Sequence, residues 1–220
     1  MEDRFDVIII GAGVIGNSIA RELSRYSINV AVIEKELDVS MGTSSRNSGV
    51  VHSGIHYTPG SLRARLCVQG NSLMKDLCHD LKVKIEYLGK LTVARNNEEI
   101  KSLHMLKEQG EINGVPGLEI INKNTMEKIQ PNVGGVKALH SPSTGIICPY
   151  TLTIALAENA AANGCHFFLG HQVTSISKKD GLFEVKTNNK KIKANVLVNS
   201  AGLYSADICT MLGINEYKIY

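Results

Sequence analysis

The chain has 220 residues, of which 43% are hydrophobic and 20% charged, and its formal net charge is +3. This composition is typical of a folded globular protein and excludes a disordered chain. The lysines are scattered apart from the short cluster Lys190, Lys191 and Lys193, so no face for nucleic acid is expected. The cysteines form no CxxC pair, and no apolar stretch approaches the ~20 residues that cross a bilayer. Since the N-terminus lacks the pattern of a secretory signal, a cytoplasmic protein is expected, with membrane contact at most peripheral.

The N-terminal segment predicts a strand, a helix and a second strand in that order. Residues 5–10 (FDVIII) form a continuous apolar run, as in a parallel strand buried on both faces. Apolar side chains then recur at helical spacing, at Ile15, Ile19, Ala20 and Leu23. Residues 29–34 (NVAVIE) give the second buried strand. The pattern indicates a βαβ unit with a short crossover.

Three glycines lie where the first strand turns into the helix. Gly11, Gly13 and Gly16 have the spacing GxGxxG, which permits a tight turn, close approach of the backbone to a pyrophosphate, and close helix-strand packing. In dinucleotide-binding units an acidic residue that binds ribose follows the glycines by ~20 residues, and Glu34 lies at about this spacing. Its carboxylate disfavours the 2′-phosphate of NADP. The alternative is a glycine-rich turn beside an unrelated glutamate. The glycines alone leave NAD and FAD open.

Two segments of different character follow. Residues 35–57 are rich in Ser, Gly, Thr and Asn, so we expect an extended, functional loop laid over another part of the protein. Leucines at helical spacing then predict a helix over residues 61–81 with one buried face, and Gly70 is a weak point in it. These leucines are Leu62, Leu66, Leu73, Leu77 and Leu81.

The remainder of the chain predicts an inserted segment and a return to the first sheet. Residues 83–140 mix short strands with polar helices. After Pro149, an Ala-rich helix is expected to end before Gly164. Strand-like pieces follow, with a hairpin turn at Asp180 and Gly181. The predicted fold class is α/β, a Rossmann-like nucleotide-binding domain with an inserted, incomplete α+β domain.

A longer motif carries a resemblance to a known family. Residues 42–57 read GTSSRNSGVVHSGIHY, and with FDVIIIGAGVIG and VNSAG they resemble the FAD-dependent oxidoreductases of the D-amino-acid oxidase and glycerol-3-phosphate dehydrogenase superfamily. The motif is similar to the NSG-V/I-x-H signature of glycerol-3-phosphate dehydrogenases or oxidases and of L-2-hydroxyglutarate oxidases. The resemblance runs from Phe5 to the end of the chain. It implies non-covalent FAD, FAD-binding parts at 1–82 and 146–220, and part of a substrate domain at 83–145.

The resemblance also implies which residues bind FAD. Glu34 and Lys35 would meet the adenosine ribose. Short polar side chains of the 42–57 motif would follow the pyrophosphate and ribityl chain, because they can hydrogen-bond a polyol without crowding it. The backbone of Val173 would contact adenine. The complete set of expected cofactor-binding residues is Gly11, Gly13, Val14, Ile15, Gly16, Glu34, Lys35, Thr43, Ser44, Ser45, Asn47, Ser48, Gly49, Val173, Ser200, Ala201 and Gly202.

His52 is the expected catalytic base. In a flavin enzyme the cofactor takes the hydride, and the protein removes a proton from the substrate. Histidine titrates near neutral pH, and the resembling enzymes place one here. The alternative is a histidine hydrogen-bonded in a loop for structure. His56 and Tyr57 either line the same pocket or only pack, and Arg46 is either exposed or contacts an anion. The other histidines show no metal-ligand spacing.

The expected activity is oxidation of a small anionic 2-hydroxy compound, with sn-glycerol 3-phosphate first and L-2-hydroxyglutarate second. An amine or amino-acid oxidase of the same superfamily is an alternative, and so is a non-catalytic subunit of a split flavoenzyme. The resembling enzymes are longer, and the chain ends in an apparent strand (KIY), so a fragment is expected. The electron acceptor, whether quinone, oxygen or a partner protein, stays open.

Overall fold

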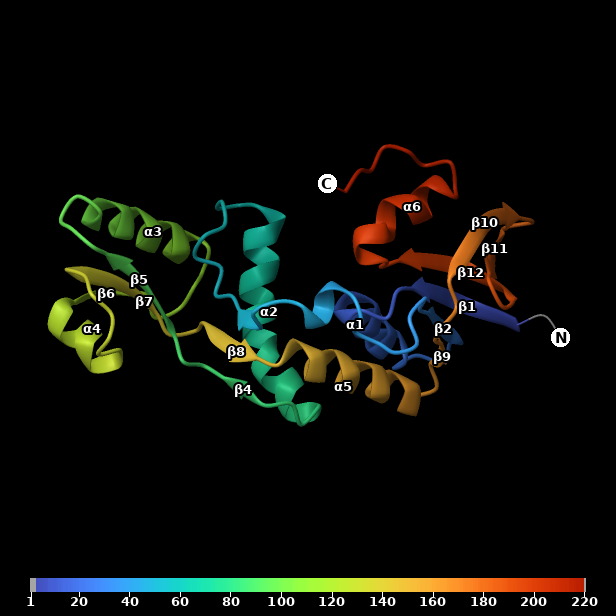
Figure 1. Cartoon of the computed structure of the whole chain (residues 1–220), viewed down its shortest axis with the longest axis horizontal. Coiled ribbons are helices and arrows are strands. Elements are labelled where there is room, and N and C mark those ends of the chain that lie inside the picture. Colours follow the sequence, from blue (N-terminus) through green and yellow to red (C-terminus); the bar gives the residue numbers. More distant parts are fainter. Residues whose placement is uncertain (1–2, 220) are drawn as a thin grey trace. The chain divides into compact units, whose positions relative to one another are not determined.

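The computed structural model describes residues 3–219, which divide into two compact units. The first unit comprises the residues up to Asn47 together with those from Pro149 onward, and the inserted unit is Ser48–Cys148 (Figure 1). The predicted division into 1–82, 83–145 and 146–220 is a division by role, and it stays a prediction. The compact units divide the chain at other residues.

The first unit contains a six-stranded sheet with helices on its faces. Its elements are β1 (Asp3–Ile10), α1 (Val14–Leu23), β2 (Val30–Ile33), the 3-10 turn η1 (Thr43–Ser45), α5 (Pro149–Ala162), β9 (His166–Phe168), β10 (Val173–Lys179), β11 (Leu182–Thr187), β12 (Lys191–Asn199), the 3-10 turn η2 (Gly202–Tyr204) and α6 (Ser205–Thr210). The strand order is β10-β11-β12-β1-β2-β9. Strands β12, β1, β2 and β9 pair in parallel, whereas β10, β11 and β12 pair antiparallel. The predicted α/β, Rossmann-like class is confirmed.

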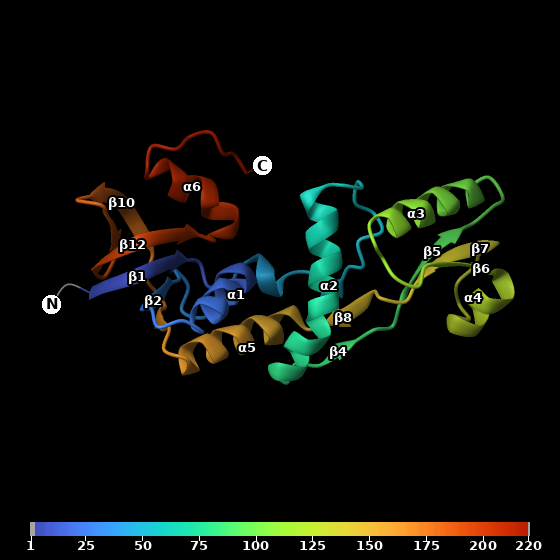
Figure 2. The same ribbon diagram turned by 180° about the vertical axis from the view of Figure 1, so that it is seen from behind.

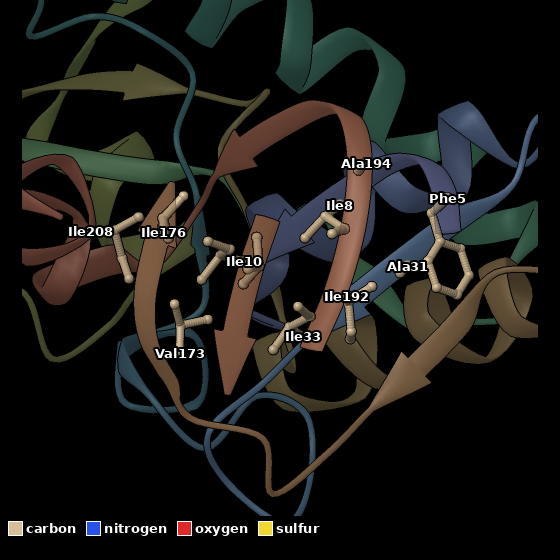
Figure 3. Close-up of a cluster of buried hydrophobic side chains, with 11 residues drawn as sticks. Phe5, Ile8, Ile10, Ala31, Ile33, Val173, Ile176, Ile192, Ala194 and Ile208 are labelled. Carbon is tan, nitrogen blue, oxygen red and sulfur yellow. The ribbon is translucent and has the colours of Figure 1, made fainter. Parts of the chain in front are cut away.

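Strand β1 is buried on both faces, which explains its continuous apolar sequence. Ile8 and Ile10 lie in one core with side chains of β10, β12 and α6 (Figure 3). Val7 and Ile9 lie in the other core, with small side chains of α1 and α5 such as Ala20. Successive side chains of a strand point to opposite faces, so the strand contributes to both cores. Helices α1 and α5 lie side by side against this second face (Figures 1 and 2).

The inserted unit contains two small antiparallel sheets. Its elements are β3 (Val50–Val51), α2 (Leu62–Asp80), β4 (Ile85–Glu86), β5 (Lys90–Ala94), α3 (Ile100–Ile112), β6 (Glu119–Asn122), α4 (Lys123–Ile129), β7 (Lys137–Ser141) and β8 (Gly145–Ile147). The sheets are β3-β8-β4 and β5-β7-β6. Leu139 of β7 packs with α3 and the neighbouring Ala138 packs with α4. These two helices therefore cover opposite faces of the second sheet (Figure 2).

The helix α2 differs from its prediction in what it buries. Its leucines Leu62, Leu66 and Leu73 are 60%, 52% and 65% exposed, so the predicted buried leucine face is wrong. The helix instead buries Ala64 and Cys78. Helical spacing shows which residues share a face, but it does not show whether another element covers that face. Gly70 does not interrupt the helix.

The structure also tests the predictions made for one hairpin turn, for the 35–57 loop and for the last residues of the chain. Asp180 and Gly181 have φ of 50° and 80°, as the tight hairpin turn between β10 and β11 requires, which confirms that prediction. The 35–57 loop is not wholly extended, because it contains η1 and β3. Residues 218 and 219 are not in a strand, and Tyr220 lies outside the described residues. No helix within residues 3–219 is long and apolar enough to span a bilayer.

Candidate dinucleotide site

Three parallel strands end side by side at one edge of the first unit's sheet. The register of β1 pairs Ile10 with Ile33 of β2 and with Asn199 of β12. The next residues along each strand are Gly11, Glu34 and Ser200. The carboxyl edge of a parallel sheet is where ligands bind in Rossmann-like folds. Residues far apart in sequence are therefore assembled where a nucleotide site is expected.

Glycine is required at two positions of the turn between β1 and α1. Gly11 has φ of +104°, and a Cβ on it would lie 2.5 Å from the carbonyl oxygen of Ser200. A Cβ on Gly16 would lie 1.9 Å from the carbonyl oxygen of Gly11. The Ser200 hydroxyl donates to the carbonyl of Ile10 at 2.8 Å, which holds the turn after β12 against the turn after β1. At both positions a Cβ would collide with backbone atoms, so glycine is needed for the turn to pack this closely.

The N-terminus of α1 faces short polar groups. The backbone N–H of Val14 donates to Ser44 Oγ at 2.9 Å. A Cβ on Gly13 would lie 3.0 Å from the same oxygen, so the glycine leaves this approach open. Backbone amides at a helix N-terminus and the positive end of the helix dipole suit phosphate oxygens. The residues present therefore fit the pyrophosphate of a dinucleotide.

Glu34 is fixed at the end of β2 by two backbone donors. Its Oε2 accepts from the N–H of Ala12 at 2.7 Å, and its Oε1 accepts from the N–H of Glu36 at 3.0 Å. These charge-assisted hydrogen bonds hold the carboxylate beside the glycine turn. The neighbouring Lys35 has its Nζ 3.6 Å from the ring centroid of Tyr204. A hydrogen bond with Tyr204 raises the pKa of Lys35, and Glu36 adds to this effect.

The polar loop before Ser48 is held by its own side chains. Ser45 Oγ donates to the carbonyl of Ser40 at 2.6 Å, and Asn47 Nδ2 donates to the carbonyl of Ser44 at 2.9 Å. Arg46 Nη1 donates to the carbonyl of Met41 and, at 2.8 Å, to that of Gly42. Arg46 therefore ties the loop together through backbone carbonyls.

The predicted cofactor residues divide between the two units. Those that the first unit brings together at the sheet edge come from the glycine turn, the end of β2, η1 and the end of β12. Val173 begins β10 and is buried in the apolar core, while Ala201 and Gly202 follow β12. Ser48 and Gly49 belong to the inserted unit. The FAD contacts assigned to all these residues stay predictions. The sequence did not predict a role for Tyr204, because no local pattern indicates that it contacts Lys35.

The inserted unit has a cavity of its own around His52. Its volume is about 100 Å³, and its lining includes His52, Ser53, His56, Tyr57, Lys90 and Thr144. The carbonyl of His52 accepts from Asn71 Nδ2 at 3.1 Å, so its backbone is held. Its exposed imidazole has no hydrogen-bond partner among residues 3–219, unlike a histidine retained to secure a loop. His56 and Tyr57 share this cavity. Lys90 was missed, because it lies on a strand remote from the motif.

The fold and the glycine turn define a class, the Rossmann-like dinucleotide-binding proteins. A family profile described as "FAD dependent oxidoreductase" (DAO) matches residues 6–220. The chain belongs to this family, whose members are FAD-dependent dehydrogenases and oxidases. The predicted resemblance is thereby confirmed.

Individual relatives agree with the family. A "Glycerol 3-phosphate dehydrogenase" of Caloramator mitchellensis is 45% identical over 217 residues, which are 98% of this chain and 45% of the relative. A mitochondrial "L-2-hydroxyglutarate dehydrogenase" of Nematostella vectensis is 37% identical over 97% of this chain and 50% of the relative. The FAD-bound L-alpha-glycerophosphate oxidase of Mycoplasma pneumoniae superposes with a TM-score of 0.89 and 31% identity, covering 96% of this chain and 57% of that one. The chain thus spans about half the length of the curated relatives it matches.

Proposed function

We propose that the protein uses FAD to oxidise a small anionic 2-hydroxy compound, with sn-glycerol 3-phosphate as the first candidate. The observation that carries this proposal is the 45% identity, over 98% of the chain, to a protein named glycerol 3-phosphate dehydrogenase. The FAD-bound glycerophosphate oxidase supports the same substrate class. Because the chain covers only about half of such relatives, the proposal concerns the activity of the whole protein.

The first unit would hold FAD without a covalent bond. The amides at the N-terminus of α1 would take the pyrophosphate, and Glu34 would accept hydrogen bonds from the adenosine ribose. Ser44 would stay close to the phosphates, since its hydroxyl already meets the N–H of Val14. When bound, the flavin supplies the chemistry that accepts a hydride. The remaining requirements fall on the protein, which must orient the substrate and take up its hydroxyl proton.

His52 is the candidate for the proton. Its backbone is fixed while its imidazole is exposed and unbonded within residues 3–219, so the ring is available to a substrate. A 2-hydroxy compound needs a base, because its hydroxyl proton must leave as the hydride departs. An amine substrate needs less help. The dependence of the rate on His52 therefore distinguishes the two substrate classes.

L-2-hydroxyglutarate is the second candidate substrate. The relative of this name is 37% identical over 97% of the chain. Both candidates are small, anionic and oxidised at a carbon that carries a hydroxyl group. They differ in the charged group, which is a phosphate in one and carboxylates in the other.

The test is anaerobic mixing of the full-length, FAD-loaded protein with single substrates. Bleaching of the flavin absorbance by glycerol 3-phosphate supports the first candidate, and bleaching only by L-2-hydroxyglutarate supports the second. Bleaching only by glycine, sarcosine or a D-amino acid would reject the 2-hydroxy class. No flavin band after incubation with FAD would reject the proposal as a whole. Reoxidation of the bleached flavin by air, by a quinone or by neither then identifies the class of electron acceptor.

A further inference from the structure

The cavity of the inserted unit contains an ammonium group that has no acidic partner. Lys90 Nζ lies 2.8 Å from His56 Nε2. In the part of the chain that the structure describes, no carboxylate lies within ion-pair distance of this ammonium. A lysine ammonium only donates, so His56 must accept through a neutral ring. Two N–H groups of Lys90 are left for another acceptor.

The position of Lys90 is fixed by the backbone around it. The residue begins β5 and pairs with Ser141 of β7. The preceding Gly89 has φ of +75° and donates its N–H to the carbonyl of Thr144 at 3.0 Å. The start of the strand is thus held against the turn that follows β7. The half-buried lysine side chain is presented to the cavity from a defined strand end.

Ser53 and Thr144 line the same cavity, and their hydroxyl groups are linked through Ser141. Thr144 Oγ1 donates to Ser141 Oγ at 3.3 Å, and Ser141 Oγ donates to Ser53 Oγ at 2.9 Å. All three residues are buried. Since each hydroxyl carries one proton, the hydroxyl of Ser53 keeps its own proton for a further acceptor. Ser53 lines the cavity, so this donor is available there.

The surroundings of His56 are positively charged. Partial burial lowers the pKa of His56, and the charge of Lys90 and the electrostatic interaction with His52 lower it further. The guanidinium of Arg63 lies 5.0 Å from the ring centroid of Tyr57, which lines the same cavity. An anion among these groups would offset the positive charge and accept the spare hydrogen bonds.

We propose that this cavity binds a small oxyanion through Lys90, and that the oxyanion is the charged group of the substrate. The second clause rests on the proposed function. A volume of about 100 Å³ is well below the ~300 Å³ of pockets that enclose whole drug-sized ligands, so it suits one charged group. Carboxylate and phosphate share the chemistry required, which is an anionic oxygen that accepts from an ammonium and a hydroxyl.

The test measures anion binding without turnover, in the full-length FAD-loaded protein. Sulfate and acetate are titrated separately while the histidine imidazole resonances are followed by NMR, and a His56→Gln variant assigns the His56 signal. Sulfate is chosen because its charge is constant near neutral pH. We expect a saturable shift of the His56 resonance and a rise in its pKa, because the bound anion opposes the charge of Lys90. Tighter sulfate binding indicates a phosphate-type ligand, and tighter acetate binding indicates a carboxylate.

Three variants decide whether Lys90 is responsible. Lys90→Met should weaken anion binding about tenfold, the size of one charge-assisted hydrogen bond, and Lys90→Arg should restore most of it. Lys101→Met removes the same charge from an exposed position of α3 and should leave binding unchanged. No saturable shift up to about 50 mM anion, or equal binding by wild type and Lys90→Met, would overturn the site. Flavin bleaching by substrate without anion binding refutes the anion site and leaves the proposed function standing. Anion binding without bleaching by any 2-hydroxy compound refutes the proposed function and the assignment of the anion to the substrate, and leaves the anion site standing.

Discussion

Replacing Gly11 by alanine tests whether the glycine turn between β1 and α1 packs against the turn that follows β12. Two costs are expected. The φ of +104° is unfavourable for alanine by about 1–2 kcal/mol. The new Cβ would also lie 2.5 Å from the Ser200 carbonyl oxygen, and overpacking of this kind costs about 1–3 kcal/mol. The free energy of opening of the first unit should therefore fall by about 2–5 kcal/mol.

Two glycines of the same unit serve as matched controls. Gly164 has a similar φ of +94° with nothing within 4 Å of an added Cβ, so Gly164→Ala should show only the backbone cost of about 1–2 kcal/mol. Gly42 has neither feature, and Gly42→Ala should change stability by less than about 0.5 kcal/mol. Hydrogen exchange of the β1 amides measures the opening of this unit separately from the inserted one. Equal losses from Gly11→Ala and Gly164→Ala would show that the contact with Ser200 contributes nothing.

Further predictions concern the base, the cap of α1 and the pH dependence of stability. In the full-length enzyme His52→Ala should lower kcat/KM by about 10²–10⁴ with unchanged FAD content, and a retained kcat/KM would remove the support for a hydroxyl substrate. Ser44→Ala should destabilise the first unit by about 1 kcal/mol in hydrogen exchange, because the N–H of Val14 loses its acceptor; exchange as slow as in wild type would contradict this role. Burial, Lys90 and His52 lower the pKa of His56 in the folded state, so below about pH 6.5 the unfolded chain takes up a proton that the folded chain does not. Urea unfolding should show that the free energy of unfolding decreases as the pH is lowered below this value. His56→Gln should make this decrease smaller, and an unchanged pH dependence in the variant would contradict the prediction.

The sheet edge was predictable because its signals are local. A continuous apolar run, the GxGxxG spacing and a strand-end glutamate each have a direct physical cause in a βαβ unit, and the structure brings them together at adjoining strand ends. The glycine spacing also predicted where backbone segments pack closely. Gly16 leaves no space for a Cβ beside Gly11, which is what its place in the motif implied.

Other features depend on contacts that sequence spacing does not encode. The acceptor of the Val14 N–H comes from Ser44 in a separate turn, and the partner of His56 is Lys90 at the start of β5. The leucine stripe of α2 correctly predicted a helix, yet Leu62 and Leu73 are exposed. Helical periodicity arises from the helix alone, whereas burial requires a second element. These side chains could be placed only once the fold was known.

The most direct test of the account is a titration of the full-length apoprotein with FAD, followed by calorimetry or by quenching of flavin fluorescence. We predict saturable binding of one FAD per chain and about tenfold weaker binding by Glu34→Ala, because that variant loses the charged acceptor fixed at the end of β2. Absence of FAD binding, or equal affinity in the wild type and Glu34→Ala, would contradict the assignment of the flavin site to this sheet edge.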